Sequence, residues 1–399
     1  MLSRRAAVQL IGFMFGASKS YQVSAATVSF GMAKPVALPK NEASWQQLHL
    51  ATSKYLTVTA SINGTAVSAI IDTGATRSVV NAAWAQRLAL PTSGTLSAAA
   101  LTGQVNGTLY RVRTLGVGDV VVHNIDISSF DVSAIEGSLS RELPLVVGQD
   151  LLASAILEVE FPRDRARLSA SLDPKRVEGF TKLPVAWGQS NLPHIPVDIE
   201  DSLRSEAIVD LGSHVLCSIS ESFAREHGLL GGRPTSTTMT VGVEGPSISR
   251  IFSLRTLRFG PYVLHDVPAC AVSNWNFSQP INLGWPCFSA FDFLLDTKAA
   301  ALWLAASPER LKQAIPRDRS GIGAARLPDR LVIRHVAENS PAAHAGLRDG
   351  DEIIAMDGRA VDADYPSPSE RQGEKPAGTR IDIRLADGRA LTVILADYF

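Results

Sequence analysis

The sequence has little of what marks several classes of protein. Its 399 residues include only three cysteines, too few for a disulfide-built scaffold. Charged residues make up 19% of the chain and the net charge is −1, which excludes the basic surplus that nucleic acids and anionic membranes attract. The eight histidines are scattered, and none lies near Cys or Glu at a metal-ligand spacing. We therefore expect no metal, no other cofactor and no nucleic-acid partner.

The three cysteines, Cys217, Cys270 and Cys287, all fall in the second half of the chain. An odd number leaves at least one thiol free or paired with another chain. One disulfide can form in an oxidising compartment, and the sequence does not select the pair.

The apolar stretch near the N-terminus, residues 6–17, is also short. A bilayer span needs about 20 apolar residues. The stretch follows Arg4 and Arg5 and precedes the small residues of Val23–Ala25, as in an export signal with its cleavage site. We expect residues 1–26 to be such a signal and the mature protein to be periplasmic or secreted. The paired arginines point to the twin-arginine route, and an ordinary secretory signal is the alternative.

What the chain does have is an internal repeat with a period of about 140 residues. Three pairs of segments match in the same order: Ile70–Gly74 with Ile208–Gly212, Arg113–Gly118 with Arg255–Gly260, and Leu145–Gly148 with Pro280–Gly284. Two copies of this length indicate a duplicated domain and not a solenoid.

Each copy of the repeat reads mainly as strand. Residues 55–62 alternate in character, Asn63-Gly64 predicts a hairpin turn, and residues 66–71 run back. One helix is expected after each matched aspartate, over about residues 81–87 and 221–227. We therefore predict a mostly β protein with lobes at residues 47–170 and 183–306, a linker at 307–320 and an α+β unit at 321–399.

The matched segments place two carboxylates, Asp72 and Asp210, each at the end of an apolar strand and two residues before a glycine. Two such side chains about 3 Å apart cannot both ionise, because like charges repel. The ionised one can take a proton from a water molecule while the protonated one polarises a carbonyl group. An aspartate that only bonds its own turn is the alternative at each position, and it is the stronger alternative at Asp210.

The run Asp72-Thr73-Gly74-Ala75 resembles the active-site motif of retropepsin-like and pepsin-like aspartic proteases, and the two lobes resemble a fused retropepsin homodimer. The resemblance covers about residues 47–306. It implies duplicated acid-protease-like β-barrel lobes and an aspartic endopeptidase that cleaves protein or peptide substrates, with Asp72 and Asp210 as the catalytic pair. It implies loop-supporting roles and flap candidates for further residues: Thr73, Gly74, Thr76, Gly212 and Ser213 in the loops, Gly103 and Gly242 in the flaps.

One position departs from that family. Where it has Thr or Ser after the aspartate, the second loop has Leu211. We expect Thr73 to lack a partner hydroxyl, a loss of about 1 kcal/mol that would loosen the pair. A catalytically weak or inactive protease-like protein that binds peptides is therefore the alternative function.

The last 79 residues, 321–399, resemble a bacterial PDZ domain through the run from Ser340 to Gly358. The resemblance implies that a loop of backbone N–H groups captures the C-terminus of a peptide ligand or partner. That loop is expected at Gly321, Ile322, Gly323 and Ala324. A simple linker turn is the alternative.

Overall fold

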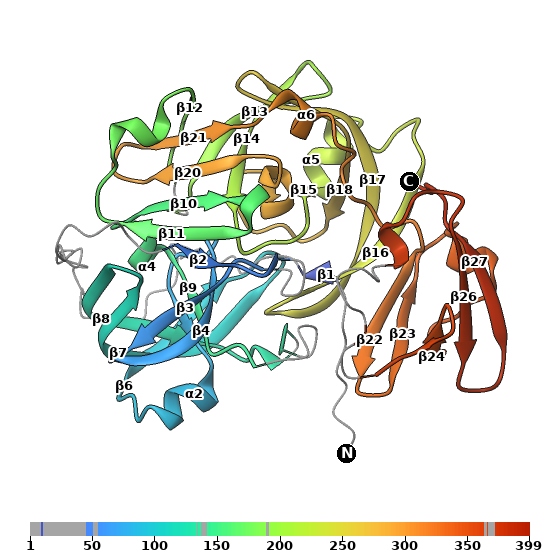
Figure 1. Ribbon diagram of the computed structural model, residues 1–399, viewed down its shortest axis with the longest axis horizontal. Coiled ribbons are helices and arrows are strands. Elements are labelled where there is room, and N and C mark those ends of the chain that lie inside the picture. The colour runs from blue at the N-terminus through green and yellow to red at the C-terminus, as the bar shows by residue number, and fades with distance from the viewer. Residues whose placement is uncertain are drawn as a thin grey trace.

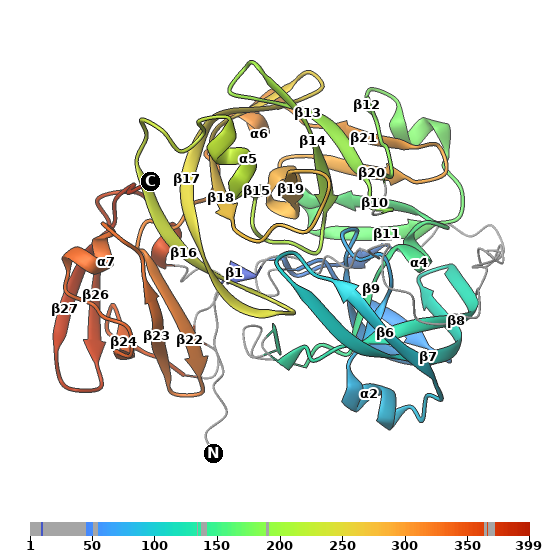
Figure 2. The ribbon, with the colours of Figure 1, turned by 180° about the vertical axis from the view of Figure 1, so that it is seen from behind.

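The computed structural model describes residues 9–10, 45–50, 55–133, 135–136, 142–188, 191–362, 365 and 372–399. The expected export signal lies outside these residues, apart from the two-residue strand β1 (Gln9–Leu10). The chain is mostly β and forms four sheets, which confirms the predicted fold class. Figures 1 and 2 show two lobes stacked on one another and a third unit beside them. No helix of the described residues is long and apolar enough to cross a membrane.

The first lobe is a seven-stranded sheet in the order β3-β4-β9-β5-β8-β7-β6, in which β3 also pairs with β7. The hairpin predicted at Asn63-Gly64 joins its first two strands, with Asn63 and Gly64 both at positive φ. The strands are β3 (Thr57–Ile62), β4 (Thr65–Ile71), β5 (Val79–Val80), β6 (Thr92–Ala99), β7 (Gln104–Val117), β8 (Val120–Ser129) and β9 (Leu145–Val147).

The second lobe repeats this arrangement in an eight-stranded sheet, β1-β16-β17-β13-β14-β19-β15-β18, in which β17 also pairs with β18. The strands are β13 (His194–Ile199), β14 (Leu203–Asp210), β15 (Cys217–Ser220), β16 (Thr235–Gly242), β17 (Gly245–Phe259), β18 (Tyr262–Val272) and β19 (Ile281–Gly284). In both lobes a short strand runs parallel to the strand that leads to the aspartate, β9 beside β4 and β19 beside β14.

Each expected helix follows its aspartate loop, as α2 (Ala82–Arg87) and α5 (Glu221–Glu226). The Asn81 side chain caps α2 by accepting from two backbone N–H groups. A second helical turn in each lobe was not predicted, α4 (Gln149–Leu152) and η3 (Trp285–Phe288). These four-residue turns are too short to give a periodic apolar pattern.

A third sheet joins the lobes, in the order β12-β21-β20-β10-β11-β2. Its central strands pair across the lobes, and Glu158 lies opposite Leu294, which is 136 residues further along the chain, the same separation as that of the matched Gly148 and Gly284. An axis that relates the two lobes therefore passes through this pair. The strands are β2 (Gln46–Gln47), β10 (Ile156–Glu160), β11 (Arg165–Ser169), β12 (Thr181–Pro184), β20 (Asp292–Asp296) and β21 (Ala301–Ala305), with the turns η1 (Phe161–Arg163) and η2 (Pro174–Val177). The sequence reading gave these segments to separate lobes.

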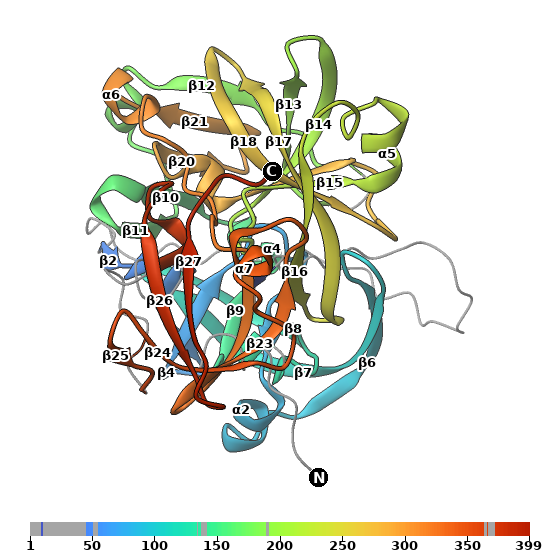
Figure 3. The ribbon, with the colours of Figure 1, turned by 90° about the vertical axis from the view of Figure 1, so that its right-hand side faces the viewer.

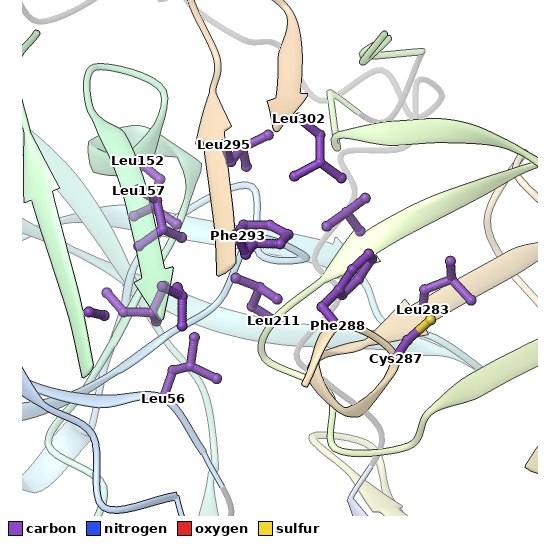
Figure 4. Packing of buried hydrophobic residues seen from close by; sticks show 14 of the residues in the cluster. Leu56, Leu152, Leu157, Leu211, Leu283, Cys287, Phe288, Phe293, Leu295 and Leu302 are labelled. Atoms are coloured by element: carbon purple, nitrogen blue, oxygen red, sulfur yellow. The ribbon is translucent and has the colours of Figure 1, made fainter. Parts of the chain in front are cut away.

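The main core runs through both lobes and the shared sheet. Leu56 of the first lobe and Leu211 of the second belong to one buried cluster with Phe288 and Phe293, and Figure 4 shows these side chains together. Burying a side chain of this size stabilises the fold by about 1.5–3 kcal/mol. The two lobes therefore share a continuous core.

All three cysteines are buried and free, so the disulfide left open by the sequence does not form. Burial raises the pKa of the Cys270 thiol to about 12 and raises that of Cys287 as well. The pKa of Cys217 is raised by its burial and by the nearness of the other two thiols. All three are therefore neutral thiols at physiological pH.

The C-terminal unit has its own sheet, in the order β22-β23-β24-β26-β27 with β25 on β24, and its own core. The short helix α6 (Pro308–Leu311) lies in the connection before it. Its elements are β22 (Ile322–Leu327), β23 (Arg330–Val336), α7 (Pro341–His344), β24 (Glu352–Met356), β25 (Arg359–Ala360), η5 (Gln372–Glu374), β26 (Arg380–Leu385) and β27 (Ala390–Ile394). The unit contacts the second lobe along β16, as Figure 3 shows.

Candidate active site

The structure brings Asp72 and Asp210 together where the two lobes meet. Asp72 follows the last residue of β4, Asp210 ends β14, and both are fully buried. A Cβ atom on Gly74 would lie 2.6 Å from the Asp210 carboxylate, and one on Gly212 would lie 2.4 Å from Asp72 Oδ1. Real Cβ atoms do not approach this closely. Both loops therefore need glycine so that each backbone can pass against the opposing carboxylate.

The two carboxylates share a hydrogen bond but receive different numbers of donors. Asp72 Oδ1 accepts from the backbone N–H of Gly74 at 2.8 Å. Asp210 Oδ1 accepts from the backbone N–H groups of Gly212 at 3.0 Å and Ser213 at 3.1 Å. Asp210 Oδ2 also accepts from Asn282 Nδ2 at 2.9 Å. Asp210 is thus the better stabilised anion.

Titration follows the same asymmetry. Burial, the charge of Asp210 and the hydrogen bond between the two raise the pKa of Asp72 well above its ordinary value, although the N–H groups of Gly74 and Ala75 offset part of this effect. Burial raises the pKa of Asp210 to about 6. The rise is limited because hydrogen bonds offset part of the effect of burial; their donors are Asn282, Asp72, Gly212 and Ser213. Between these pKa values the pair holds one proton, on Asp72, and one negative charge, on Asp210.

Thr73 braces the two loops although Leu211 has no hydroxyl. Its Oγ1 donates to the carbonyl oxygen of Val209 at 2.6 Å and accepts from the Leu211 N–H at 2.9 Å. The expectation that Thr73 needs a partner hydroxyl was therefore wrong, because the partner groups are backbone atoms. What Leu211 removes is only the reciprocal brace from the second loop to the first. Its side chain is fully buried in the shared core instead.

The two apolar segments that end in glycine support the aspartate loops from behind. Gly148 backs onto the Ala75 carbonyl and Gly284 onto the Ser213 carbonyl, with no room for a Cβ atom at either place. The next residue after each glycine donates its N–H to the same carbonyl, at 2.8 Å in the first lobe and 2.9 Å in the second. The loops are held alike in both lobes.

Two further predicted loop residues lie in the same region. Ser213 reaches the Asp210 carboxylate through its backbone N–H, while its hydroxyl pairs with the backbone of Val215. Thr76 is half-buried in the first loop.

The flap candidates Gly103 and Gly242 lie at the tips of two matched hairpins, β6–β7 and β16–β17. The tips are crossed, because Leu101 is buried in a cluster of the second lobe and Val241 in a cluster of the first. Glu244 Oε1 accepts from the N–H and the hydroxyl of Thr102, at 3.1 and 2.7 Å, and so joins one tip to the other. Both aspartate side chains are fully buried.

A cavity of about 730 Å³ lies elsewhere, between the second lobe and the connection to the C-terminal unit. Its walls include Cys287, Arg310 and Arg317 and neither aspartate. It therefore plays no part in the carboxylate chemistry.

In the glycine loop of the C-terminal unit, two backbone N–H groups donate to side chains of the same chain. The N–H of Gly321 donates to Asp318 Oδ2 at 2.7 Å, and the N–H of Ile322 donates to Ser320 Oγ at 3.2 Å. Gly323 and Ala324 pair with β23 on either side of an irregularity in the register. A peptide carboxylate would have to displace Asp318 to reach the Gly321 N–H.

The sequence reading missed Asn282 and the flap contacts. Asn282 had a usable signal, since its counterpart in the first copy of the repeat is Val146 and a polar residue replaces an apolar one. Leu101 and Glu244 had none, because their partners belong to the other copy of the repeat.

Two protein-family models match the chain. The model of gag-polyprotein aspartyl proteases matches residues 58–154, and an aspartyl protease model matches residues 195–286. Each match contains one aspartate loop and its supporting glycine segment. A search among curated proteins gave no match. Residues 58–154 and 195–286 are therefore each similar to aspartyl protease domains, and this similarity points to a peptidase.

Proposed function

We propose that the protein is an aspartic endopeptidase that hydrolyses peptide bonds in protein or peptide substrates. The observation that supports it best is the pair of fully buried carboxylates that meet across the two lobes, each packed against the glycine of the opposing loop. A buried pair of this kind is costly to keep for stability alone.

In the proposed reaction Asp210 takes a proton from a water molecule while the water oxygen bonds to the carbonyl carbon of the substrate. Asp72 gives its proton to the carbonyl oxygen, so a tetrahedral diol forms without a covalent link to the enzyme. When the C–N bond breaks, the leaving nitrogen takes the proton held by Asp210, and Asp72 recovers its own from the diol.

Cleavage of an unfolded protein and of a peptide library by Asp72→Asn and Asp210→Asn tests this function. We expect each variant to lose at least about 100-fold in kcat/KM, the range for losing a general acid or base. Variants that cut as fast as the parent would contradict the proposal. A parent that binds the peptides without cutting them would favour the alternative of an inactive peptide-binding protein. The reason to test this alternative is that Leu211 cannot make the reciprocal hydroxyl brace.

We also propose that residues 321–399 recognise the C-terminus of a peptide. In support, β22 lies at an edge of its sheet, where a peptide strand can add, and the unit contacts the flap strand β16 through His335 and Glu338, which bond Thr237 at 3.0 and 3.2 Å. Fluorescence anisotropy with free and C-terminally amidated peptides tests this. We expect Asp318→Ala to strengthen binding of the free form alone, and equal binding of both forms would contradict the proposal.

We further propose that the protein is exported with residues 1–26 as its signal, on the sequence pattern described above. N-terminal sequencing of the cell-derived protein tests this, and a chain that still begins at Met1 in the cytoplasm would overturn it.

A further inference from the structure

Asn282 occupies a place that its counterpart in the first lobe fills with an apolar side chain. In the first lobe Val146 of β9 lies beside Ile70, and in the second lobe Asn282 of β19 lies beside Ile208. Val146 is 1% exposed and Asn282 is not exposed at all. The same position therefore accepts valine in one lobe and an amide in the other.

The amide is only half satisfied. Its Nδ2 donates to Asp210 Oδ2 at 2.9 Å, and its buried Oδ1 has no hydrogen-bond partner among the described residues. A buried polar atom without a partner destabilises a fold, and such atoms in native proteins call for a reason. Because valine fits the matched position, packing does not supply that reason. The bond to Asp210 does.

The Asn282 amide is the main hydrogen-bond donor that the Asp210 carboxylate has and the Asp72 carboxylate lacks. Each aspartate receives N–H groups from its own loop, and Asp72 Oδ2 receives no hydrogen bond from a donor group in the described part of the chain. An N–H donor stabilises the ionised form of a carboxylate over the protonated one. The Asn282 amide thus places the negative charge on Asp210 and leaves the proton to Asp72.

Other charges near Asp210 do not explain the asymmetry. From the first aspartate loop Asp72 bonds Asp210, and β15 contributes Cys217, a neutral thiol. Strand β19 contributes no titratable group. The Asp210 loop itself contains one further titratable residue up to this point, His214, and its Nδ1 bonds the hydroxyl of Tyr55 at 3.3 Å. The amide of Asn282 is therefore the group that distinguishes the two sides.

We propose that Asn282 is a positioning residue that holds Asp210 as the ionised member of the pair, so that Asp72 acts as the acid. This inference rests on the proposed peptidase function for its kinetic consequence, and its effect on the protonation of Asp210 can be measured without a substrate.

The test is Asn282→Val, which gives the second lobe the residue of the first. The titration of Asp210 is followed by ¹³C NMR of its carboxyl carbon, assigned with Asp210→Asn, and the pH profile of kcat/KM is recorded beside it. Loss of one hydrogen bond to a charged group should raise the midpoint of Asp210 by about one to two pH units. The acid limb of kcat/KM should move up by the same amount.

Ile208→Val is the matched control, because it trims the neighbour of Asn282 and leaves the amide in place; both curves should stay where they are. Asn282→Ser, whose side chain is too short to make this bond, serves as a second variant if the first does not fold. An Asp210 midpoint unchanged in a folded Asn282 variant overturns the inference, even if the parent cleaves peptides. A raised midpoint in a protein that cleaves nothing supports the inference and contradicts the peptidase proposal.

Discussion

The loop that holds Asp72 and the loop that holds Asp210 share one backbone design, but their surroundings differ at two positions that change the hydrogen bonds of the site. After the aspartate, the first loop has Thr73, which braces the other lobe, and the second has Leu211, which packs into the core. Behind the aspartate, the first lobe has the apolar Val146 and the second has Asn282, which donates to the carboxylate. Each lobe therefore performs one of two tasks. The first lobe supplies the threonine that joins the two loops, and the second lobe supplies the amide that stabilises the negative charge on Asp210.

This division explains how the site can differ from a symmetric pair and still be complete. A symmetric site would have two hydroxyl braces and no preference for the proton. Here one brace remains, with both of its hydrogen bonds made, and the proton has a preferred place. Substitutions that act on one loop at a time test whether the two lobes divide these tasks.

The largest effect should come from closing the space at the glycines. We expect Gly212→Ala and Gly74→Ala to lower kcat/KM by more than about 100-fold, because a misplacement of about 1 Å at a reacting group costs that much. Gly212→Ala should be the worse of the two, since its Cβ would lie 2.2 Å from Asp72 Cγ, against 2.6 Å from Asp210 Cγ at Gly74. Thermal unfolding of both variants measures the accompanying strain.

Gly231→Ala is the control for that pair, because its nearest neighbour would be 3.5 Å away and its φ is not positive. A Gly212→Ala variant as active as the Gly231→Ala control would mean that the two loops do not approach as described.

The second prediction concerns pH. If Asp210 must be ionised to take a proton, activity should rise with pH through its pKa of about 6 and fall again when Asp72 loses its proton. At pH 4, two units below that pKa, kcat/KM should be about 100-fold lower than on the plateau. A pH profile of kcat/KM, with circular dichroism to verify folding at each pH, measures this. A plateau that extends down to pH 4 would contradict the assignment.

How much of this comparison the sequence could predict depends on where each partner lies. The aspartates, their glycines and the supporting segments were predictable because each motif lies within one repeat and occurs twice. The brace was misjudged because Thr73 bonds backbone atoms, which no residue type reveals. The shared sheet and the crossed flap tips join one repeat to the other, so no local pattern predicts them. Asn282 was visible in the sequence and was read only as part of an apolar match.

The third prediction removes the surviving brace. Thr73→Val keeps the shape of the side chain but leaves the Val209 carbonyl and the Leu211 N–H buried without their partner. We expect unfolding in urea to show a loss of about 1–3 kcal/mol, with a loss of roughly tenfold in kcat/KM, since about 1.4 kcal/mol of transition-state positioning corresponds to that factor. A stability equal to that of the parent would show that water replaces the hydroxyl and that the brace is dispensable.

The fourth prediction adds the missing brace. By the symmetry of the two loops, Leu211→Thr should bring a hydroxyl near the backbone of Ile71 and Thr73. The hydrogen bonds gained are worth about 1 kcal/mol each, whereas removing buried apolar groups beside Phe293 costs a similar amount or more. We expect a net loss of about 1 kcal/mol in urea unfolding and a modest change in kcat/KM. A gain in stability would show that the brace outweighs the packing of Leu211.

The smallest effect should come from the contact between the flap tips, where the lobes again make unequal contributions. Glu244 of the second hairpin accepts two hydrogen bonds from Thr102 of the first, and both side chains are near the surface. Exposed hydrogen bonds of this kind contribute about 0.5–1 kcal/mol, so Glu244→Ala should open the tips about two- to fivefold more often. Hydrogen exchange of the Thr102 amide measures the opening, and Glu244→Gln, which retains an acceptor oxygen, is the matched control. If opening limits substrate entry, kcat/KM should rise by the same factor in Glu244→Ala alone. Faster exchange without faster cleavage would mean that the buried contacts of Leu101 and Val241, and not this surface clasp, determine when the site opens.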